Sequence, residues 1–261
     1  MNKGVFENRN PNNKNGNFKN NWRFNYPPID PLTIKENVAF YCPHLQDVDL
    51  SSTTILNLAN RTQSGTLEST ATLTTDSNGI KEVNFGLTGR VNLSNRYKEA
   101  RPTVIAIMKN TNNTPAIQII GSAGTTGTVG YLLFKNGTNQ LAWRANIGGA
   151  TLNQIVYGNR HTFDENTWKM YVGSYDQTTA RIYQNNYIAT NGGNPLTGAI
   201  DYTGITVAYW GMYQGGTGVA ARHWQGSGRA YLIFSRALNY DEIIGVYNYF
   251  YKLKMVDVID V

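Results

Sequence analysis

The chain has very little of the residues that mark disulfide, thiol or metal chemistry. Its 261 residues include one cysteine, Cys42, and three histidines, His44, His161 and His223. A single cysteine excludes an internal disulfide, and the histidines stand singly, without the spacing of a transition-metal site. We therefore predict no metal centre and no catalytic thiol, and we expect Cys42 to be a small buried apolar residue.

Long apolar runs are also missing. No segment offers the roughly 20 consecutive apolar residues that cross a bilayer. The first residues, MNKGVFENRNPNNKNG, lack the apolar centre of a signal peptide. The sequence thus predicts a protein that does not insert into a membrane and does not leave a cell by the general secretory route.

Charge is sparse, at 15% of residues, with a formal net charge of +6. The first 25 residues hold five Lys or Arg and one Glu, a net of +4, so that the other 236 residues carry only +2. A nearly neutral body predicts no nucleic-acid partner, and any electrostatic contact would involve mainly the N-terminal segment.

Residues 1–37, which we call the N-terminal arm, differ in composition from the body, residues 38–261. Ten of the first 25 residues are Asn, and four of the eight prolines fall in this region, which disfavours helix and central strand. The arm also carries the aromatic residues Phe6, Phe18, Trp22, Phe24 and Tyr26. Aromatic side chains on an extended polar segment predict docking. We favour a neighbouring subunit as the acceptor, and the chain's own body is the alternative.

The body reads as an all-β domain. Short apolar or β-branched runs are separated by clusters of Gly, Asn, Thr and Ser, and a hairpin turn is predicted at 135–138. Regular spacing of this kind favours a β-sandwich. The runs that predict strands are 104–108, 116–120, 131–134, 141–144, 170–172, 181–183, 206–209 and 230–234.

One helix is predicted, after Leu238. Asn239 can cap it, and Glu242 stands three residues further on, as a capping box requires. The residues that then share one face are Ile243, Val246, Tyr247, Phe250 and Leu253. A helix with such a face covers a sheet.

Three stretches carry a family resemblance. The closing one runs from the 230–234 strand into Arg236, Ala237, Leu238 and Asn239, followed by Glu242 and Ile243. The second is the hairpin NTWKMYVGSYD at 166–176 with ARIYQN at 180–185, and the third is ILNLAN at 55–60 with SGTL at 64–67. In this order they resemble the laminin-G-like, concanavalin-type jelly-roll sandwiches. The resemblance spans residues 38–253 and implies glycan or protein binding at exposed loops.

Some families with this fold are glycoside hydrolases, which need two carboxylates about 5–10 Å apart around one sugar. The E-x-D-x-x-E strand pattern of the laminarinase type is absent. The nearest pairs, Asp164–Glu165 and Asp241–Glu242, are adjacent residues whose side chains point in different directions. We predict a protein that is not an enzyme, with a degenerate hydrolase as a lesser alternative.

Some laminin-G-like domains bind Ca²⁺ at one rim, and the resemblance places Asn57 where an Asp is usual. An amide supplies an oxygen without a charge, so affinity for a hard cation would fall. The remaining acidic candidates are Asp47, Asp49, Asp76 and Asp201. We expect no cofactor and keep Ca²⁺ as the minor alternative.

The Gly-rich loop from Gly211 to Gly228 is the predicted glycan site. Aromatic rings stack on sugar faces, and amide, guanidinium and imidazole groups hydrogen-bond hydroxyls. The candidate residues are Tyr213, Arg222, His223, Trp224 and Gln225. Packing in the core is the alternative for Trp224.

Together these features predict a structural protein of a virus particle, and specifically of a phage. A lectin-like domain would decorate the capsid, attached to other virion subunits by the N-terminal arm and facing cell-surface glycans. Such a protein is made in the host cytoplasm and located in the virion. A free carbohydrate-binding protein, with the arm folded on its own body, is the alternative.

Overall fold

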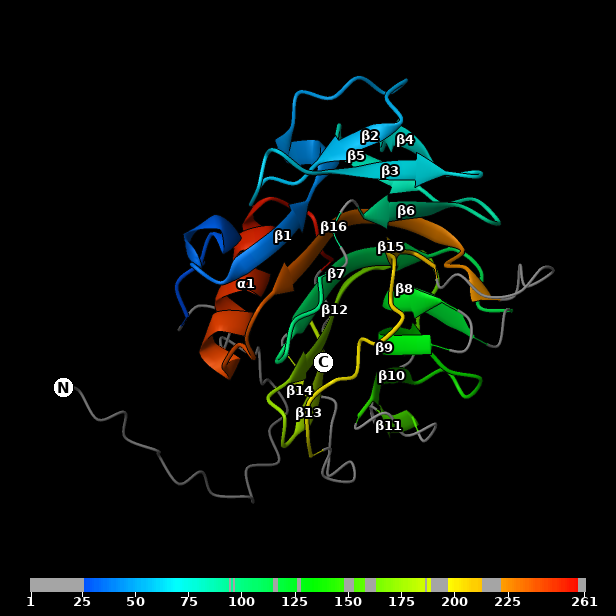
Figure 1. The fold of residues 1–261 in the computed structure, drawn as a ribbon. Coiled ribbons are helices and arrows are strands. Elements are labelled where there is room, and N and C mark those ends of the chain that lie inside the picture. The colour runs from blue at the N-terminus through cyan, green and yellow to red at the C-terminus, as the bar shows by residue number, and fades with distance from the viewer. Residues whose placement is uncertain are drawn as a thin grey trace, which may run out of the picture.

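The computed structural model describes residues 26–93, 95, 97–114, 117–125, 128–147, 153–157, 163–185, 187–188, 197–212 and 222–257. These residues form two antiparallel sheets, A and B, which pack face to face, and the helix α1 (Tyr240–Lys252) (Figure 1). The predicted jelly-roll β-sandwich with a C-terminal helix is confirmed. None of the described helices has the length and apolar character needed to span a bilayer.

Sheet A is built around the two long strands β7 and β16, which lie side by side. Its order is β14 (Tyr187–Ile188), β13 (Ala180–Gln184), β12 (Trp168–Tyr175), β7 (Thr103–Asn110), β16 (Gly226–Phe234), β5 (Lys81–Asn84) and β4 (Thr72–Thr75). β1 (Asn37–Tyr41) pairs with the second half of β16, next to the place where β5 pairs with the first half.

Sheet B packs on the inner face of sheet A. Its order is β11 (Asn153–Tyr157), β10 (Leu141–Asn146), β9 (Thr128–Lys135), β8 (Gln118–Thr125), β15 (Ala208–Trp210), β6 (Arg90–Leu93), β3 (Ser64–Glu68) and β2 (Thr54–Leu56). The predicted hairpin turn connects β9 to β10, where the N–H of Asn136 donates to the carbonyl of Gln140 (2.9 Å). A strand overlaps each of the eight predicted runs, although β8 begins only at Gln118 of the run 116–120 and β15 only at Ala208 of the run 206–209.

The centre of sheet A is buried on both faces, which explains why β7 is apolar from Val104 to Met108. Val104, Ala106 and Met108 point toward sheet B, whereas Ile105 and Ile107 lie in the cluster beneath α1. A strand covered on both sides is expected to read as a continuous apolar run and not as an alternating one. Trp143 and Trp168 are buried in these two layers, as is Cys42, and burial raises the pKa of the Cys42 thiol to about 12.

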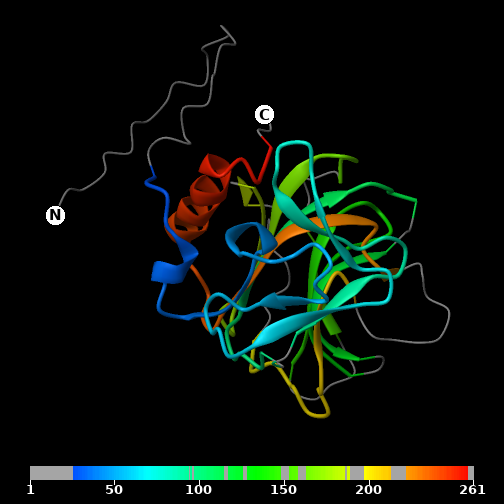
Figure 2. The ribbon, with the colours of Figure 1, turned by 90° about the horizontal axis from the view of Figure 1, so that it is seen from above.

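Helix α1 lies against the outer face of sheet A, beside β1 and β16 (Figure 1 and Figure 2). Asn239 and Glu242 form the predicted capping box: the Asn239 side chain accepts from the Glu242 N–H, and the Glu242 carboxylate accepts from the Asn239 N–H, each at 2.9 Å. Of the predicted apolar face, Ile243, Val246, Tyr247 and Phe250 are buried and Leu253 is half-buried.

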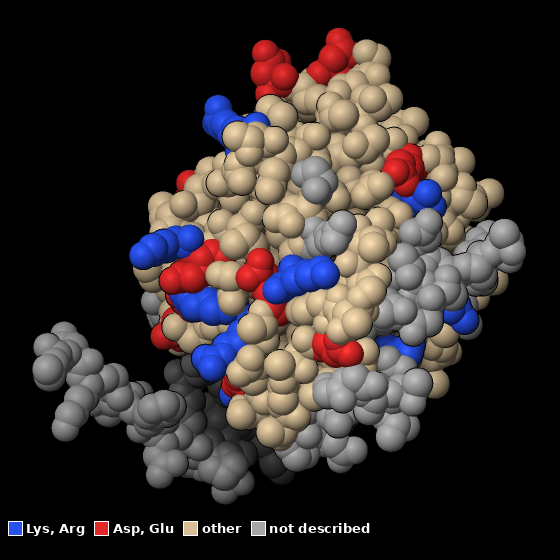
Figure 3. All heavy atoms as spheres, viewed as in Figure 1, with Lys and Arg blue, Asp and Glu red and all other residues tan. Residues whose placement is uncertain are grey.

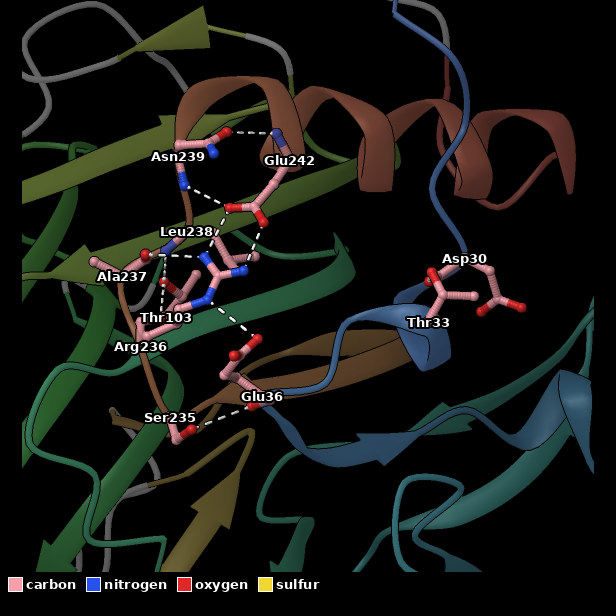
Figure 4. Close-up of polar contacts among 10 residues, drawn as sticks. All are labelled: Asp30, Thr33, Glu36, Thr103, Ser235, Arg236, Ala237, Leu238, Asn239 and Glu242. Carbon is pink, nitrogen blue, oxygen red and sulfur yellow. Dashed lines mark hydrogen bonds and ion pairs between the residues drawn. The ribbon is translucent and has the colours of Figure 1, made fainter.

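The residues between β16 and α1 form a junction that explains the closing motif (Figure 4). The Arg236 guanidinium donates two hydrogen bonds to the Glu242 carboxylate (2.8 and 2.6 Å) and pairs with Glu36 (3.2 Å). From β7, the Thr103 hydroxyl accepts from the Leu238 N–H and donates to the Arg236 carbonyl, both at 2.9 Å. The hydrogen bonds from Arg236 hold the pKa of Glu242 below its usual range. The motif therefore fixes the direction in which the helix leaves the sheet.

The described end of the N-terminal arm, residues 26–37, packs on the same chain. The Ile29 N–H donates to the Gly245 carbonyl in α1 (2.9 Å), and Asn248 donates to the Tyr26 carbonyl (2.8 Å). The Tyr26 ring meets the Tyr240 ring edge to face at 6.3 Å. A side chain at Gly245 would collide with Ile29, since a Cβ there would lie 2.5 Å from its Cδ1. The folded unit therefore includes residues 26–37.

The other aromatic residues of the arm, Phe6, Phe18, Trp22 and Phe24, lie outside the described residues. Their predicted contact with a neighbouring subunit stays a prediction. Tyr26 contacts α1 of its own chain, as the alternative describes.

Candidate functional site

Trp224 belongs to the core and offers no ring face to a ligand, which corrects its predicted role as a stacking platform. Its side chain is 0% exposed. The ring packs at a steep angle against Phe163 (6.2 Å between centroids) and Tyr171 (5.8 Å), which are stacked on each other, and the indole N–H donates to the Lys109 carbonyl (3.1 Å). The apolar surface of the ring is thus buried against other rings, and its N–H group has a hydrogen-bond partner within the fold.

Gln225 is a structural residue as well. Its side-chain oxygen accepts from Asn112 (2.7 Å), and its own N–H donates to the side chain of Gln118 (3.1 Å). Its carbonyl accepts from the Thr111 N–H (2.9 Å). Because the amide is buried among these partners, the prediction that it binds a sugar hydroxyl is corrected.

The other residues of the predicted glycan site differ in how exposed they are. Arg222 is exposed, and His223 is buried beside Gly89 and Arg90 at the start of β6. Tyr213 lies outside the described residues. Of the predicted glycan-site residues, His223 is therefore the one that lies next to a group of polar side chains. Nothing in the sequence indicated this proximity.

These polar groups lie at one end of sheet B, on the face turned away from sheet A. Glu68 in β3 stands directly opposite Arg90 in β6, and Asn92 in β6 stands opposite Tyr209 in β15. We call Glu68, Arg90, Asn92, Tyr209, Met212 and His223 the rim cluster. None of the first five was predicted from the sequence.

The rim cluster is held by its own contacts. The Glu68 carboxylate accepts from Arg90 (2.5 Å) and from Asn92 (2.8 Å). The Arg90 guanidinium also lies over the Tyr209 ring, 5.3 Å from its centroid, and donates to the Met212 sulfur (3.1 Å). Opposed charges on neighbouring strands stabilise a sheet by themselves, so these contacts also have a structural role.

The pair nevertheless keeps an open side. The side chains of Glu68 and Arg90 are 28% and 22% exposed, and Asn92 is half-buried. His223 is 8% exposed, and its Nδ1 is a buried atom without a hydrogen-bond partner. The cluster thus presents a carboxylate, a guanidinium and an amide within one small region, beside the buried imidazole, and these three are groups that orient a polyol.

The pKa of His223 is held below its ordinary value. Burial is the main cause, and the positive charge of Arg90 adds to it, while the Gly89 backbone opposes both. A neutral imidazole beside a paired carboxylate and guanidinium leaves the cluster without net charge. The wider surface agrees with this: Lys and Arg alternate with Asp and Glu over the face in Figure 3, with no broad area of one sign among its described residues.

The low pKa of His223 predicts a pH dependence of stability. In the unfolded chain the imidazole regains its ordinary pKa of 6.5, so the unfolded state binds the proton first as the pH falls. We expect the free energy of unfolding to begin to decrease near pH 6.5, and His223→Gln to remove that part of the decrease. Urea unfolding of both proteins between about pH 7.5 and about pH 5 measures the difference.

His44→Gln is the control, because His44 lies in the short 3₁₀ turn at Pro43–Leu45, far along the chain from this cluster. The assignment fails if the wild type and His223→Gln lose stability in parallel throughout this range.

The amide of Asn57 is fully used inside the fold, which argues against the calcium site that the resemblance raised. Its oxygen accepts from the N–H groups of Phe40 (2.9 Å) and Ala59 (3.0 Å). Its nitrogen donates to the Val38 carbonyl (3.0 Å) and to the Tyr97 hydroxyl (3.1 Å). A cation at this position would have to displace several of these bonds.

The other acidic candidates do not come together. Asp49 and Asp201 each accept from the chain two residues ahead, at Ser51 (2.7 Å) and Thr203 (2.8 Å). Asp76 pairs with Arg229. Asp47 is exposed. Among the described residues no three His, Cys, Asp or Glu side chains form a group that could hold a metal ion.

The adjacent carboxylates Asp164 and Glu165 face different partners, as their sequence positions predicted. Asp164 pairs with the buried Lys169 (2.5 Å), whereas Glu165 accepts from the Asn113 N–H (2.7 Å). Asp241 lies in the first turn of α1, next to the Glu242 that binds Arg236. Neither pair has the arrangement of two carboxylates around one sugar.

The family of the chain follows from its sequence and agrees with this architecture. A family model described as the concanavalin A-like lectin/glucanases superfamily matches residues 84–244, which is more than half of the chain. The chain belongs to this superfamily. The matching model is of the laminin-G type, which confirms the resemblance inferred from the motifs. Membership of the superfamily accounts for the sandwich fold. A comparison with curated proteins gave no match.

Solved structures share this superfamily's sandwich at low sequence identity. The Trypanosoma rangeli sialidase in complex with the inhibitor DANA has a TM-score of 0.58 and 15% identity, over 85% of this chain and 35% of the sialidase. Domain 4 of AbnA, an arabinanase from Geobacillus stearothermophilus, in complex with arabinotriose, has a TM-score of 0.53 and 14% identity, over 81% of this chain and 98% of that domain.

The receptor-binding domain of a mosaic botulinum neurotoxin of serotype C/D has a TM-score of 0.57 and 13% identity, over 81% of this chain and 50% of that domain. The chain spans about a third of the length of the sialidase. Identities this low describe a shared fold, a lectin-like sandwich that occurs beside catalytic domains and in binding domains alike.

Proposed function

We propose that the protein is a non-enzymatic, carbohydrate-binding structural protein of a virus particle. In this proposal the lectin-like sandwich binds glycans at the rim cluster, and residues 1–25 attach it to other subunits of the particle. The observation that carries the glycan-binding part is the rim cluster, in which Glu68, Arg90 and Asn92 present donors and acceptors from one end of sheet B.

The contacts of the carboxylates support the absence of catalysis. A glycoside hydrolase keeps one carboxyl free to donate a proton and the other free to attack or to activate water. Here Glu68 is bound to Arg90 and Asn92, and Asp164 is bound to Lys169. Domain 4 of AbnA, whose structure contains arabinotriose, has the same sandwich over nearly its whole length, which supports a binding role for a domain of this shape.

The composition of the first 25 residues supports the attachment. They are Asn-rich and carry a net charge of +4, with Phe6, Phe18, Trp22 and Phe24 as aromatic anchors. Buried aromatic anchors supply most of the binding energy in protein interfaces. Because Tyr26 and Ile29 are bound to α1, the attachment by residues 1–25 would begin at a defined point on the body.

Two nested truncations test this attachment. Removing residues 1–25 is expected to leave the melting temperature nearly unchanged but to abolish incorporation into the particle. Removing residues 1–37 is expected to lower the melting temperature too, because it deletes the contacts of Ile29 with Gly245 and of Glu36 with Arg236. Calorimetry measures the first quantity, and quantitative mass spectrometry of purified particles measures the second.

Trp22→Ala combined with Phe24→Ala is the point-mutant counterpart and should reproduce most of the loss of incorporation. Normal incorporation of the chain that lacks residues 1–25 would refute the attachment. Absence of the chain from purified particles would refute the virion assignment as a whole.

A free carbohydrate-binding protein is the second candidate. The docking of residues 26–37 on their own body favours it, because an arm that continued along α1 would leave no segment for a partner. Sedimentation of the purified chain separates the two: a monomer that enters no assembly supports the free protein.

A further inference from the structure

We infer that the rim cluster selects neutral sugars, not sialylated or sulfated ones. This inference rests on the proposed glycan-binding function and concerns the class of sugar. It follows from three features of the site: the internal pairing of its charges, the neutral state of its imidazole, and the scarcity of charge in the segments around it.

The charges of the cluster cancel within one ion pair. Arg90 and Glu68 are joined at 2.5 Å, and Asn92 donates to the second oxygen of the same carboxylate at 2.8 Å. An acidic sugar would have to bring its carboxylate close to Glu68 and compete for Arg90. Separating Arg90 from Glu68 would leave that half-buried carboxylate unpaired, and an ion pair between Arg90 and the sugar would not offset this cost.

A neutral sugar needs no such exchange. Vicinal hydroxyls both donate and accept, so one can donate to the open side of Glu68 while its neighbour accepts from Arg90. Hydrogen bonds to charged groups are the stronger ones, and here both charged groups are already oriented.

The surrounding sequence contains few charges. The turns that follow Glu68 and precede Arg90, at 69–71 and 86–89, read STA and GLTG, without Lys, Arg, Asp, Glu or His. The cation next to His223 in the sequence is Arg222, which is exposed. A single exposed charge binds a counter-charge weakly in water. These segments therefore lack the several cations that would hold an anionic glycan.

The test is a glycan array in which each oligosaccharide is printed in a neutral form and in sialylated and sulfated forms. We expect binding to neutral members, with little change when the salt concentration is raised, since screening weakens only charge-dependent contacts. Glu68→Gln and Arg90→Met are each expected to weaken this binding by about tenfold or more. Glu68→Gln keeps the shape of the side chain but replaces one acceptor oxygen with a donor.

Arg181→Met is the matched control, because Arg181 also forms a surface ion pair, with Asp176 at 3.1 Å, but in β13 of sheet A. It should leave glycan binding unchanged. Melting curves accompany every variant, and if Arg90→Met does not fold, the isosteric Glu68→Gln decides.

The outcomes separate the two levels of the proposal. A preference for the acidic forms overturns the inference and leaves glycan binding in place. Neutral-sugar binding that survives both substitutions overturns the role of the rim cluster. Binding to no glycan on the array refutes the proposed function itself, and the inference with it.

Discussion

Trp224→Ala is expected to lower the free energy of unfolding by about 3–5 kcal/mol, the range for large aromatic residues removed from a core. The ring is 0% exposed and packs against the stacked rings of Phe163 and Tyr171, so its removal leaves a cavity in the core. The carbonyl of Lys109 also loses the indole N–H from which it accepts a hydrogen bond. Urea unfolding followed by circular dichroism measures the change.

Arg222→Ala, two positions earlier and exposed, is the control and should change stability by about 0.5 kcal/mol or less. A loss for Trp224→Ala as small as that of the control would show that the ring is outside the core. Weakened glycan binding in a fully stable Trp224→Ala protein would restore the stacking role that the sequence predicted.

Arg229→Met is expected to lower the free energy of unfolding by about 3–5 kcal/mol, because it leaves buried carboxylates without their partner. Arg229 is 2% exposed in β16 and pairs with Asp76, with Glu82 3.8 Å away. The guanidinium also donates to the carbonyls of Lys254 and Met255 (3.3 and 3.1 Å). Methionine keeps most of the side-chain length, so the charge and the hydrogen bonds are what is lost.

The pKa of Asp76 gives this prediction a second readout. Burial alone would raise that pKa, but the N–H groups of Ile80 and Asn78 and the charge of Arg229 outweigh it and hold the pKa below 3.8. In the wild type this carboxyl therefore contributes stability that is lost as the pH falls below about 3.8. In Arg229→Met the pKa of Asp76 should rise, so that part of the loss disappears in acid.

Asp76→Asn in the Arg229→Met background should recover some of the stability, since it removes one unpaired charge. If the double variant is no more stable than Arg229→Met, the loss comes from the deleted hydrogen bonds to the C-terminal segment and not from the carboxylates.

The strands that the sequence predicted are those that are long or buried. Val104 to Met108 is continuously apolar because α1 covers its outer side, and that signal is visible without any partner. β3 to β6 were missed because they are four or five residues long and carry polar side chains on their outer face, as in Arg90-Val91-Asn92-Leu93. Their alternation was the available signal, but over four residues it resembles that of many loops.

The rim cluster could not be predicted for a related reason. Glu68 and Arg90 are 22 residues apart, and only the register of β3 against β6 brings them together. The loop residues His223 and Trp224 have similar surroundings in the sequence, yet one lies beside Arg90 and the other enters the core. Composition describes how polar a loop is, whereas the direction of each side chain depends on the strand that follows.

The position of the arm shows the same limit. Polar composition and prolines predicted an extended chain, and residues 27–30 have neither helix nor strand, but Pro31–Thr33 forms a short 3₁₀ helix. Composition also gives no acceptor surface. Gly245 is what allows Ile29 to approach α1, and nothing near Ile29 in the sequence indicates it.

The place of β16 in sheet A has a consequence for the order in which the protein can fold during synthesis. β1 pairs with β16 in sheet A, and β4 and β5 reach β7 only across β16. A nascent chain that has not yet released residues 226–234 from the ribosome therefore holds the two sides of this sheet as separate pieces. We expect the sandwich to close in a late, nearly simultaneous step, and chains interrupted before residue 226 to depend on chaperones or to be degraded.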